Sequence, residues 1–161
     1  MTTTRTNETE IQVDPDVPLV RIIREFDAPA ERVFRAHVDP ELIVHWLGPR
    51  DLEMTVDAWD CRTGGSYRYL HTRGEETYGF HGCFHEVSAS SLIVQTFTFE
   101  GVPEGVALEK MVFEDLPGGR CRLTATSLVD TFEGRDAFVA SGMEEGIIQG
   151  YERLDELLAT G

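Results

Sequence analysis

Two groups of side chains in this sequence have the residue types that acid–base catalysts or metal sites use. In the first group, Tyr69 and His71 lie two positions apart on one predicted strand, and Tyr78 follows on the adjoining segment. A buried tyrosine–histidine pair could transfer protons to and from a substrate as it cyclises. Arg68 and Glu109 are further polar candidates, for which we expect a structural ion pair or exposure to solvent. These residues keep an enzyme open as one alternative, with no residue assigned as catalytic.

The second group is His81, Cys83 and His85, which alternate along one predicted strand and therefore share a face. Imidazole and thiolate groups are the usual zinc ligands. Neighbours on one face of a strand are roughly 6.8 Å apart, so His81 and His85 are too distant to share an ion whose bonds are about 2 Å long. We predict that these side chains face solvent, and we predict neither a metal nor another cofactor.

No other motif in the sequence indicates catalysis. The Gly-x-Ser-x-Gly pattern of a nucleophile elbow and the glycine-rich phosphate loop are both absent. Cys61, Cys83 and Cys121 are odd in number and contain no Cys-x-x-Cys pair, which argues against a disulfide framework or a structural zinc. We expect reduced thiols and a cytoplasmic protein.

The composition excludes several classes of partner. Acidic residues outnumber basic ones by 29 to 14 and the formal charge is -15, so phosphate backbones and anionic membranes would be repelled. No apolar run reaches the roughly 18 residues of a membrane span, and the N-terminus has no signal-peptide core. A chain of 161 residues with 41% apolar content suits one hydrophobic core. We therefore predict no nucleic acid or membrane partner.

The chain order predicts a polar tail followed by one domain. Residues 1–16 are too polar to bury much surface, so we expect a mobile tail there and a single domain over 17–161. A β-branched run over 19–26 predicts the first strand. Pro29 and the pair Asp39-Pro40 are typical starts of two short helices.

Six further segments have the pattern of strands separated by turn residues. Their connections are short, which indicates antiparallel hairpins. Glycine pairs and Pro117-Gly118-Gly119 supply the breaks. The six predicted strands are 52–60, 65–72, 77–87, 91–100, 106–115 and 120–129.

The last thirty residues predict one long amphipathic helix. Gly142, Gly146 and Gly150 recur every four residues on or beside its apolar stripe, which includes Met143 and Ile147. Each glycine costs roughly 1 kcal/mol relative to alanine inside a helix. The glycines therefore predict either close helix packing or an interior cavity.

These elements predict an α+β helix-grip fold, in which a seven-stranded antiparallel sheet curls around the long C-terminal helix and two short helices follow strand 1. The chain resembles the START-like superfamily, and within it the proteins similar to the activator of heat shock protein 90 ATPase. The resemblance spans about residues 18–159. The segments that carry it are Phe26–Phe34, Trp46–Pro49, Asp60–Gly65, Gly142–Gly146 and Arg153–Leu158.

The resemblance implies a hydrophobic cavity between the sheet and the long helix, which various members use for lipids, hormones or polyketides. We therefore predict a binding protein for a small apolar or aromatic molecule, with a filled core as the competing interpretation. Many relatives carry tryptophan where this chain has Ile147. The predicted ligand-binding residues are Trp46, Trp59, Tyr69, His71, Tyr78, Phe80, Phe97, Met111, Phe113, Met143, Gly146 and Ile147.

Two other functions stay open beside ligand binding. One is a polyketide cyclase-like enzyme. The other is a protein-interaction module, including a co-chaperone that activates an ATPase, because Glu144, Glu145, Glu152, Asp155 and Glu156 give the last helix an acidic face. We expect no second domain resembling the chaperone-binding part of the eukaryotic activators. An apolar strip on a sheet edge would also allow a homodimer.

Overall fold

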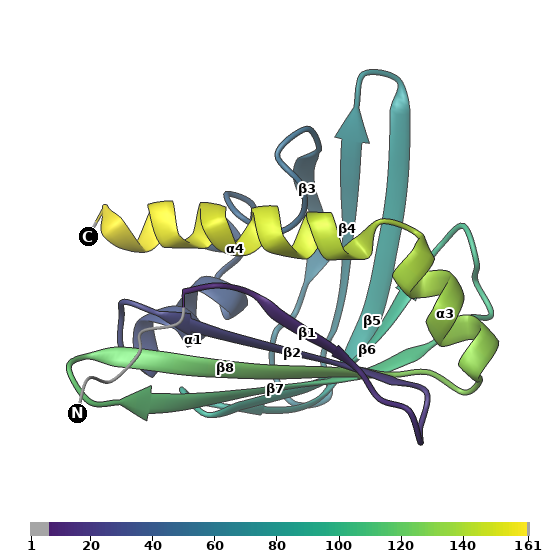
Figure 1. Ribbon diagram of the computed structural model, residues 1–161. Helices are drawn as coiled ribbons and strands as arrows, with labels where there is room; N and C mark the ends of the chain where they lie inside the picture. The colour runs from purple at the N-terminus through teal and green to yellow at the C-terminus, as the bar shows by residue number, and fades with distance from the viewer. Residues whose placement is uncertain (1–6, 161) are drawn as a thin grey trace.

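An antiparallel sheet and four helices make up the part of the chain that the structure describes, residues 7–160 of a computed structural model (Figure 1). The sheet has the strand order β1-β2-β8-β7-β6-β5-β4-β3. The strands are β1 (Glu10–Val13), β2 (Leu19–Phe26), β3 (Glu53–Trp59), β4 (Ser66–Arg73), β5 (Glu76–Ser88), β6 (Leu92–Phe99), β7 (Ala107–Leu116) and β8 (Arg120–Leu128). The helices are α1 (Ala30–Val38), α2 (Pro40–Ile43), α3 (Phe132–Ala140) and α4 (Met143–Ala159).

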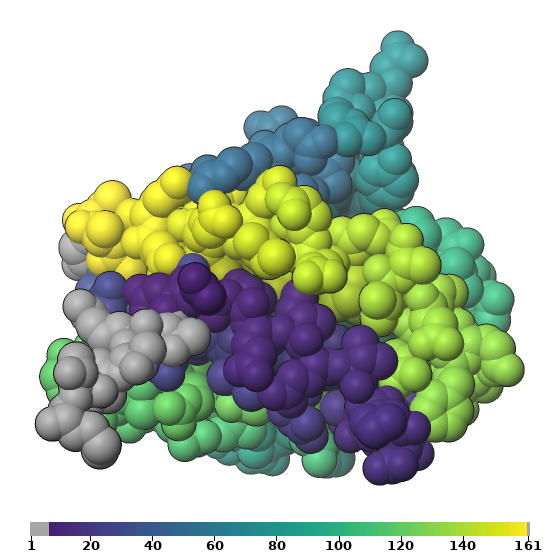
Figure 2. Space-filling model, in the orientation of Figure 1, coloured from purple at the N-terminus to yellow at the C-terminus, as the bar shows by residue number. Residues whose placement is uncertain are grey.

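This arrangement is the predicted helix-grip fold, with α4 lying across the inner face of the curved sheet (Figure 1). The hairpin of β4 and β5 projects beyond α4, as the space-filling view also shows (Figure 2). A β-bulge interrupts the pairing of β5 with β6 between Phe84 and Glu86, and bulges increase the local twist of a sheet. No helix in residues 7–160 is both long and apolar enough to cross a membrane.

The sheet has eight strands, so the predicted number of seven was one too few. The additional strand, β1, lies in the segment 1–16 that we predicted to be a mobile tail. That prediction was wrong for residues 10–13, where Ile11 pairs with Ile22 and Val13 with Val20 along the edge of β2. This short strand is ordered by backbone hydrogen bonds to its neighbour. The composition of the segment does not reveal such pairing. Residues 1–6 of the predicted tail lie outside the described part.

The C-terminal helix is divided in two, which corrects the prediction of a single helix over the last thirty residues. Gly142 precedes α4 with a φ of 88°, a left-handed conformation that glycine adopts at little cost. It therefore separates α3 from α4 instead of lying within a helix. Helix α3 has its own N-cap, since the Thr131 hydroxyl accepts a hydrogen bond from the Gly134 N–H.

The two short helices after β2 form as predicted, and their ends follow ordinary capping chemistry. Pro29 is the N-cap of α1. The Asp39 side chain caps α2 by accepting a hydrogen bond from the Glu41 N–H, and Pro40 occupies the first turn. These helices cover one end of the sheet, where α1 approaches β7 and β8.

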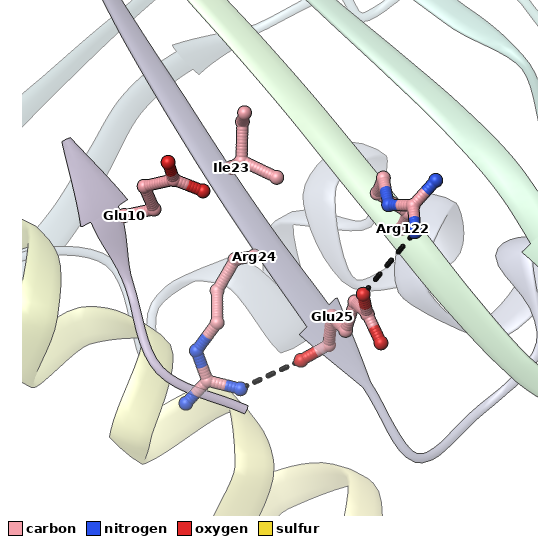
Figure 3. Close-up of a pocket in the computed structure, with 5 residues that line it drawn as sticks. All are labelled: Glu10, Ile23, Arg24, Glu25 and Arg122. Carbon is pink, nitrogen blue, oxygen red and sulfur yellow. Dashed lines mark hydrogen bonds and ion pairs between the residues drawn. The ribbon is translucent and has the colours of Figure 1, made fainter. Parts of the chain in front are cut away.

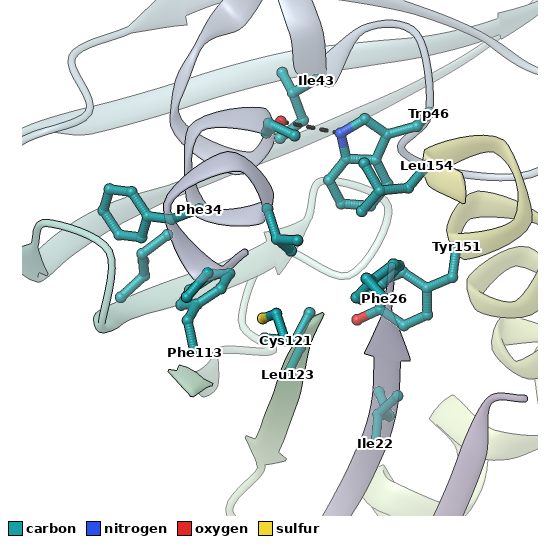
Figure 4. Close-up of a cluster of buried hydrophobic side chains, with 14 of the residues drawn as sticks. Ile22, Phe26, Phe34, Ile43, Trp46, Phe113, Cys121, Leu123, Tyr151 and Leu154 are labelled. Atoms are coloured by element: carbon teal, nitrogen blue, oxygen red, sulfur yellow. Dashed lines mark hydrogen bonds between the residues drawn. The ribbon is translucent and has the colours of Figure 1, made fainter. Parts of the chain in front are cut away.

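Beneath α1, α2 and the second half of α4 the interior is filled (Figure 4). Phe26, Val33, Leu123 and Leu154 are each 0% exposed, and Trp46 is 2% exposed. Phe26 and Tyr151 pack edge to face with ring centroids 5.5 Å apart, a favourable geometry for aromatic pairs. We call this region, represented by Phe26, Val33, Trp46, Leu123 and Leu154, the closed half of the interior.

Candidate functional site

Beneath α3 and the first turns of α4, residues that face the interior keep part of their surface accessible. On β7, for example, the inward positions alternate with exposed ones, yet Glu109 and Met111 are only half-buried. Of the residues that pair with them on the neighbouring strands, Gln95 and Ala125 are also half-buried, whereas Ile93 and Ser127 are buried. We call this region the open half: Phe80, Gln95, Phe97, Glu109, Met111 and Ala125 from the sheet, with Met143 and Ile147 from α4.

A series of aromatic rings forms one wall of the open half. Trp59 lies 5.8 Å from Tyr67, which stacks on Tyr69 at 6.0 Å. Tyr69 stacks on Phe80 at 5.2 Å, and Phe80 stacks on Phe97 at 5.5 Å. These distances join ring centroids and run from β3 to β6. Contacts of this kind favour flat, apolar or aromatic neighbours.

Gly82 allows this wall to form. It lies opposite Tyr67 in the register of β4 and β5, and a Cβ atom at Gly82 would meet the Thr96 carbonyl oxygen at 2.0 Å and the Tyr67 hydroxyl at 2.7 Å. Without that atom, the Tyr67 hydroxyl donates a hydrogen bond of 2.6 Å to the Thr96 carbonyl. The missing side chain therefore lets Tyr67 lie across β5.

Three polar side chains cross the floor of the open half on adjacent strands. Gln95, Glu109 and Ser127 are direct partners in the register of β6, β7 and β8. The Gln95 amide donates a hydrogen bond of 3.0 Å to Glu109. Burial raises the pKa of Glu109 to about 7, while hydrogen bonds from Gln95 and Ser127 act in the opposite direction. Glu109 therefore changes its charge near neutral pH.

Three tyrosines are close enough to sense the charge of Glu109. Burial raises the pKa of Tyr67, Tyr69 and Tyr151 well above the ordinary tyrosine value, and the charge of Glu109 adds to the effect. All three phenols are therefore neutral. No hydrogen bond joins the hydroxyl group of Tyr69 or of Tyr151 to another residue of the described range.

The predicted acid–base group of Tyr69, His71 and Tyr78 is not assembled as one unit. His71 is 6% exposed and its ring lies 5.3 Å from that of Tyr69. A Cβ atom at Gly48 would meet the His71 ring at 2.6 Å, so the imidazole lies under the 47–50 turn. Tyr78 instead donates its hydroxyl to Glu76 at 2.8 Å.

The protonation of His71 follows from this position. Burial lowers the pKa of His71 below the ordinary histidine value, although the Leu47 backbone acts in the opposite direction. Its Nε2 atom has no hydrogen-bond partner in the described part. A neutral imidazole against a glycine is consistent with a packing role.

Other predicted ligand-binding residues belong to the closed half or face elsewhere. Trp46 stacks on Tyr151 and donates its indole N–H to the Ala36 carbonyl at 2.9 Å. Phe113 is 4% exposed and packs edge to face with Phe34. A Cβ atom at Gly146 would meet only Pro49, at 3.5 Å, which places this glycine over the 48–52 loop.

The two further polar candidates, Arg68 and Glu109, lie in different environments. The Arg68 guanidinium forms two hydrogen bonds of 2.8 Å with Glu100, the predicted structural ion pair. Glu109 was expected in an ion pair or in solvent, and that prediction was wrong because its strand parity turns it inward. The polar row of Gln95 and Ser127 was missed for the same reason. His81, Cys83 and His85 are exposed, as predicted.

Two surface hollows lie outside the open half. One, of about 340 Å³, is lined by Glu10, Ile23, Arg24, Glu25 and Arg122 (Figure 3). Within it, Arg122 lies 3.3 Å from the Glu25 carboxylate and Arg24 donates to the Glu25 carbonyl at 2.8 Å, while the ion-pair partner of Arg24 is Asp155 outside the hollow. The other, of about 330 Å³, lies between the 50–54 segment and the tip of β4. Neither contains a predicted ligand-binding residue.

Comparison with known proteins identifies the family. The family model described as "Activator of Hsp90 ATPase homolog 1-like protein" matches residues 27–159. The chain belongs to this family. Its fold is accordingly the helix-grip fold of START-like proteins, which the resemblance predicted. No match was found among the curated proteins.

Solved structures of bacterial proteins resemble this member of the Hsp90 ATPase activator homologue family over nearly its whole length. A Rhodobacter sphaeroides protein is 27% identical with a TM-score of 0.85, covering 94% of this chain and 100% of the other. Protein Ms6760 from Mycobacterium smegmatis is 26% identical with a TM-score of 0.84, covering 94% and 96%. A protein from Arthrobacter aurescens is 25% identical with a TM-score of 0.86, covering 94% and 92%.

Proposed function

We propose that this protein binds a small aromatic or apolar molecule between the sheet and α4, in the open half of its interior. One observation carries the proposal: the inward-facing residues of β5 to β8 that define the open half keep accessible surface, while the inward residues of the closed half do not. Buried apolar surface with a few polar groups is the usual composition of a small-molecule site. The stacked rings from Trp59 to Phe97 would contact the flat face of such a molecule.

A substitution that fills this space tests the proposal. Ala125 is half-buried and pairs with Ile22 and Met111, so Ala125→Leu would occupy part of the open half. We expect the affinity for Nile red, a neutral apolar dye, to fall by about tenfold or more, with the free energy of unfolding little changed. Overpacking a filled core would instead cost about 1–3 kcal/mol.

The matched control is Thr124→Leu, the adjacent position, whose side chain points to the opposite face of β8. This variant should bind the dye as the wild type does. Dye binding that Ala125→Leu leaves unchanged would contradict the proposal, and so would a wild-type protein that takes up no dye and releases no small molecule in native mass spectrometry.

A second candidate function, proton-transfer catalysis, is favoured by the position of Glu109. A carboxyl group whose pKa is about 7 can both accept and donate a proton near neutral pH. In this candidate Glu109 takes the role that we first considered for His71. Turnover that Glu109→Gln abolishes while dye binding persists would support it, and turnover that this variant retains would remove the assignment.

A further inference from the structure

Glu109 differs from the other inward or buried carboxylates because it has no basic partner. Glu25, which is 8% exposed, lies 2.7 Å from Arg120 and 3.3 Å from Arg122. Asp155 pairs with the buried Arg24 at 2.6 Å. Within residues 7–160, no lysine, arginine or histidine forms an ion pair with Glu109.

The groups around Glu109 stabilise its ionised form by hydrogen bonding, but none of them carries a positive charge. The Gln95 amide and the Ser127 hydroxyl both donate hydrogen bonds to its carboxylate. Neutral donors compensate only part of the cost of burying a charge. A positive charge placed beside Glu109 would supply the remainder.

Two phenols whose pKa values respond to Glu109 have no hydrogen-bond partner among the described residues. Tyr69 and Tyr151 are neutral, and both sense the charge of Glu109. An ammonium group has three N–H donors, and the Glu109 carboxylate can accept a hydrogen bond from it. The aromatic wall also offers ring faces, which attract cations.

We propose that the molecule bound in the open half carries a protonated primary amino group on an aromatic body, with Glu109 as its counter-ion. This inference rests on the proposed function, because it names the class of ligand for the same site. The titratable groups whose pKa values Glu109 affects are Tyr67 and Tyr69 from β4 and Tyr151 from α4. Since none of them is basic, the charge complement has to come from the ligand.

Two probes of nearly equal shape test the inference: 1-naphthylmethylamine, which is a cation at neutral pH, and 1-naphthalenemethanol, which is neutral. At about pH 8, above the pKa of Glu109, calorimetry should give an affinity for the amine about tenfold or more higher. Glu109→Gln should remove this preference, so that the two probes bind with similar affinity. Glu114→Gln, an exposed position of the same strand, is the matched control and should retain it.

The pH dependence of amine binding is a second, independent test of the inference. Below the pKa of about 7 the carboxyl group takes up a proton, so amine affinity should fall by roughly tenfold per pH unit while alcohol affinity stays constant. Equal binding of both probes, insensitive to Glu109→Gln, would overturn this inference and leave the proposed function intact. Absence of binding by both probes and by Nile red would instead overturn the proposed function itself.

Discussion

The closed and open halves of the interior share strands β7 and β8 and helix α4, yet they differ in how completely they are filled. On β7, Phe113 packs against Phe34 and His37, whereas Glu109, four residues earlier, keeps accessible surface. On α4, Leu154 is 0% exposed and Ile147 is half-buried. We infer that the helices covering the sheet, and not its strands, determine which part of a helix-grip sheet becomes hydrophobic core.

The two halves also contain titratable groups whose pKa values shift in opposite directions. His37 lies in the closed half beside Trp46 and Phe113, and burial lowers its pKa to about 4. Glu109 lies in the open half, where burial raises its pKa to about 7. Each group is driven toward its neutral form, because both environments disfavour charge.

The largest expected effect comes from truncating α4 in the closed half. Leu154→Ala should lower the free energy of unfolding by about 3 kcal/mol, because a fully buried leucine leaves a cavity. Ile147→Ala should cost about 1 kcal/mol or less, since its side chain already borders accessible space. Urea denaturation of both variants measures the difference, and equal losses would show that the two halves are packed alike.

Acid should destabilise the protein through the closed half. The pKa of His37 is lowered from 6.5 to about 4, so its contribution is present above pH 6.5 and is lost as the pH falls through about 4. We expect His37 to contribute a loss on the order of 2 kcal/mol over this window, which the protonation of Glu109 partly offsets. His37→Phe should flatten the profile in part, because His71 shifts in the same direction.

The exposed His45 provides the control for this experiment. His45→Gln should reproduce the wild-type profile of unfolding free energy against pH. A His37→Phe profile as steep as that of the wild type would show that the acid response arises outside the closed half.

Raising the pH from about 4.5 to about 7 should destabilise the protein through the open half. The pKa of Glu109 is raised from 4.5 to about 7, so the stability associated with its protonated form is complete below 4.5 and is lost as the pH rises through about 7. Glu109→Gln should therefore stabilise the unliganded protein at about pH 8, by on the order of 1 kcal/mol, and have little effect at about pH 4. Thermal unfolding at both pH values measures this, with Glu114→Gln as the neutral comparison.

The smallest effect distinguishes the two helical glycines. Gly146→Ala should raise the free energy of unfolding by about 0.5–1 kcal/mol through helix propensity, because its Cβ would meet only Pro49 at 3.5 Å. At Gly150 the Cβ would lie 3.1 Å from the Trp46 carbonyl oxygen and 3.3 Å from the Gly48 nitrogen. Gly150→Ala should gain less or lose stability, and a gain equal to that of Gly146→Ala would refute close packing there.

Most of the fold follows from local patterns in the sequence. The strands predicted at 19–26 and between 52 and 129 match the observed ones to within about one residue, as comparison with the observed bounds shows. Alternation and turn residues determine these bounds because each strand shows one face to water and each hairpin needs glycine or a similar residue. The capping residues Asp39 and Pro40 likewise act within a few residues of the helix that they start.

The remaining features of the structure could not be predicted, because they depend on how segments of the chain pack together. Strand β1 exists because β2 offers it an edge, and the break before α4 depends on the conformation that Gly142 adopts. The inward direction of Glu109 is set by its register with Gln95 and Ser127. Which aromatic residues fill the core, and which border open space, is decided by helices that cover one end of the sheet more closely than the other. Burial is a property of the whole assembly, whereas strand and turn patterns are properties of the local chain.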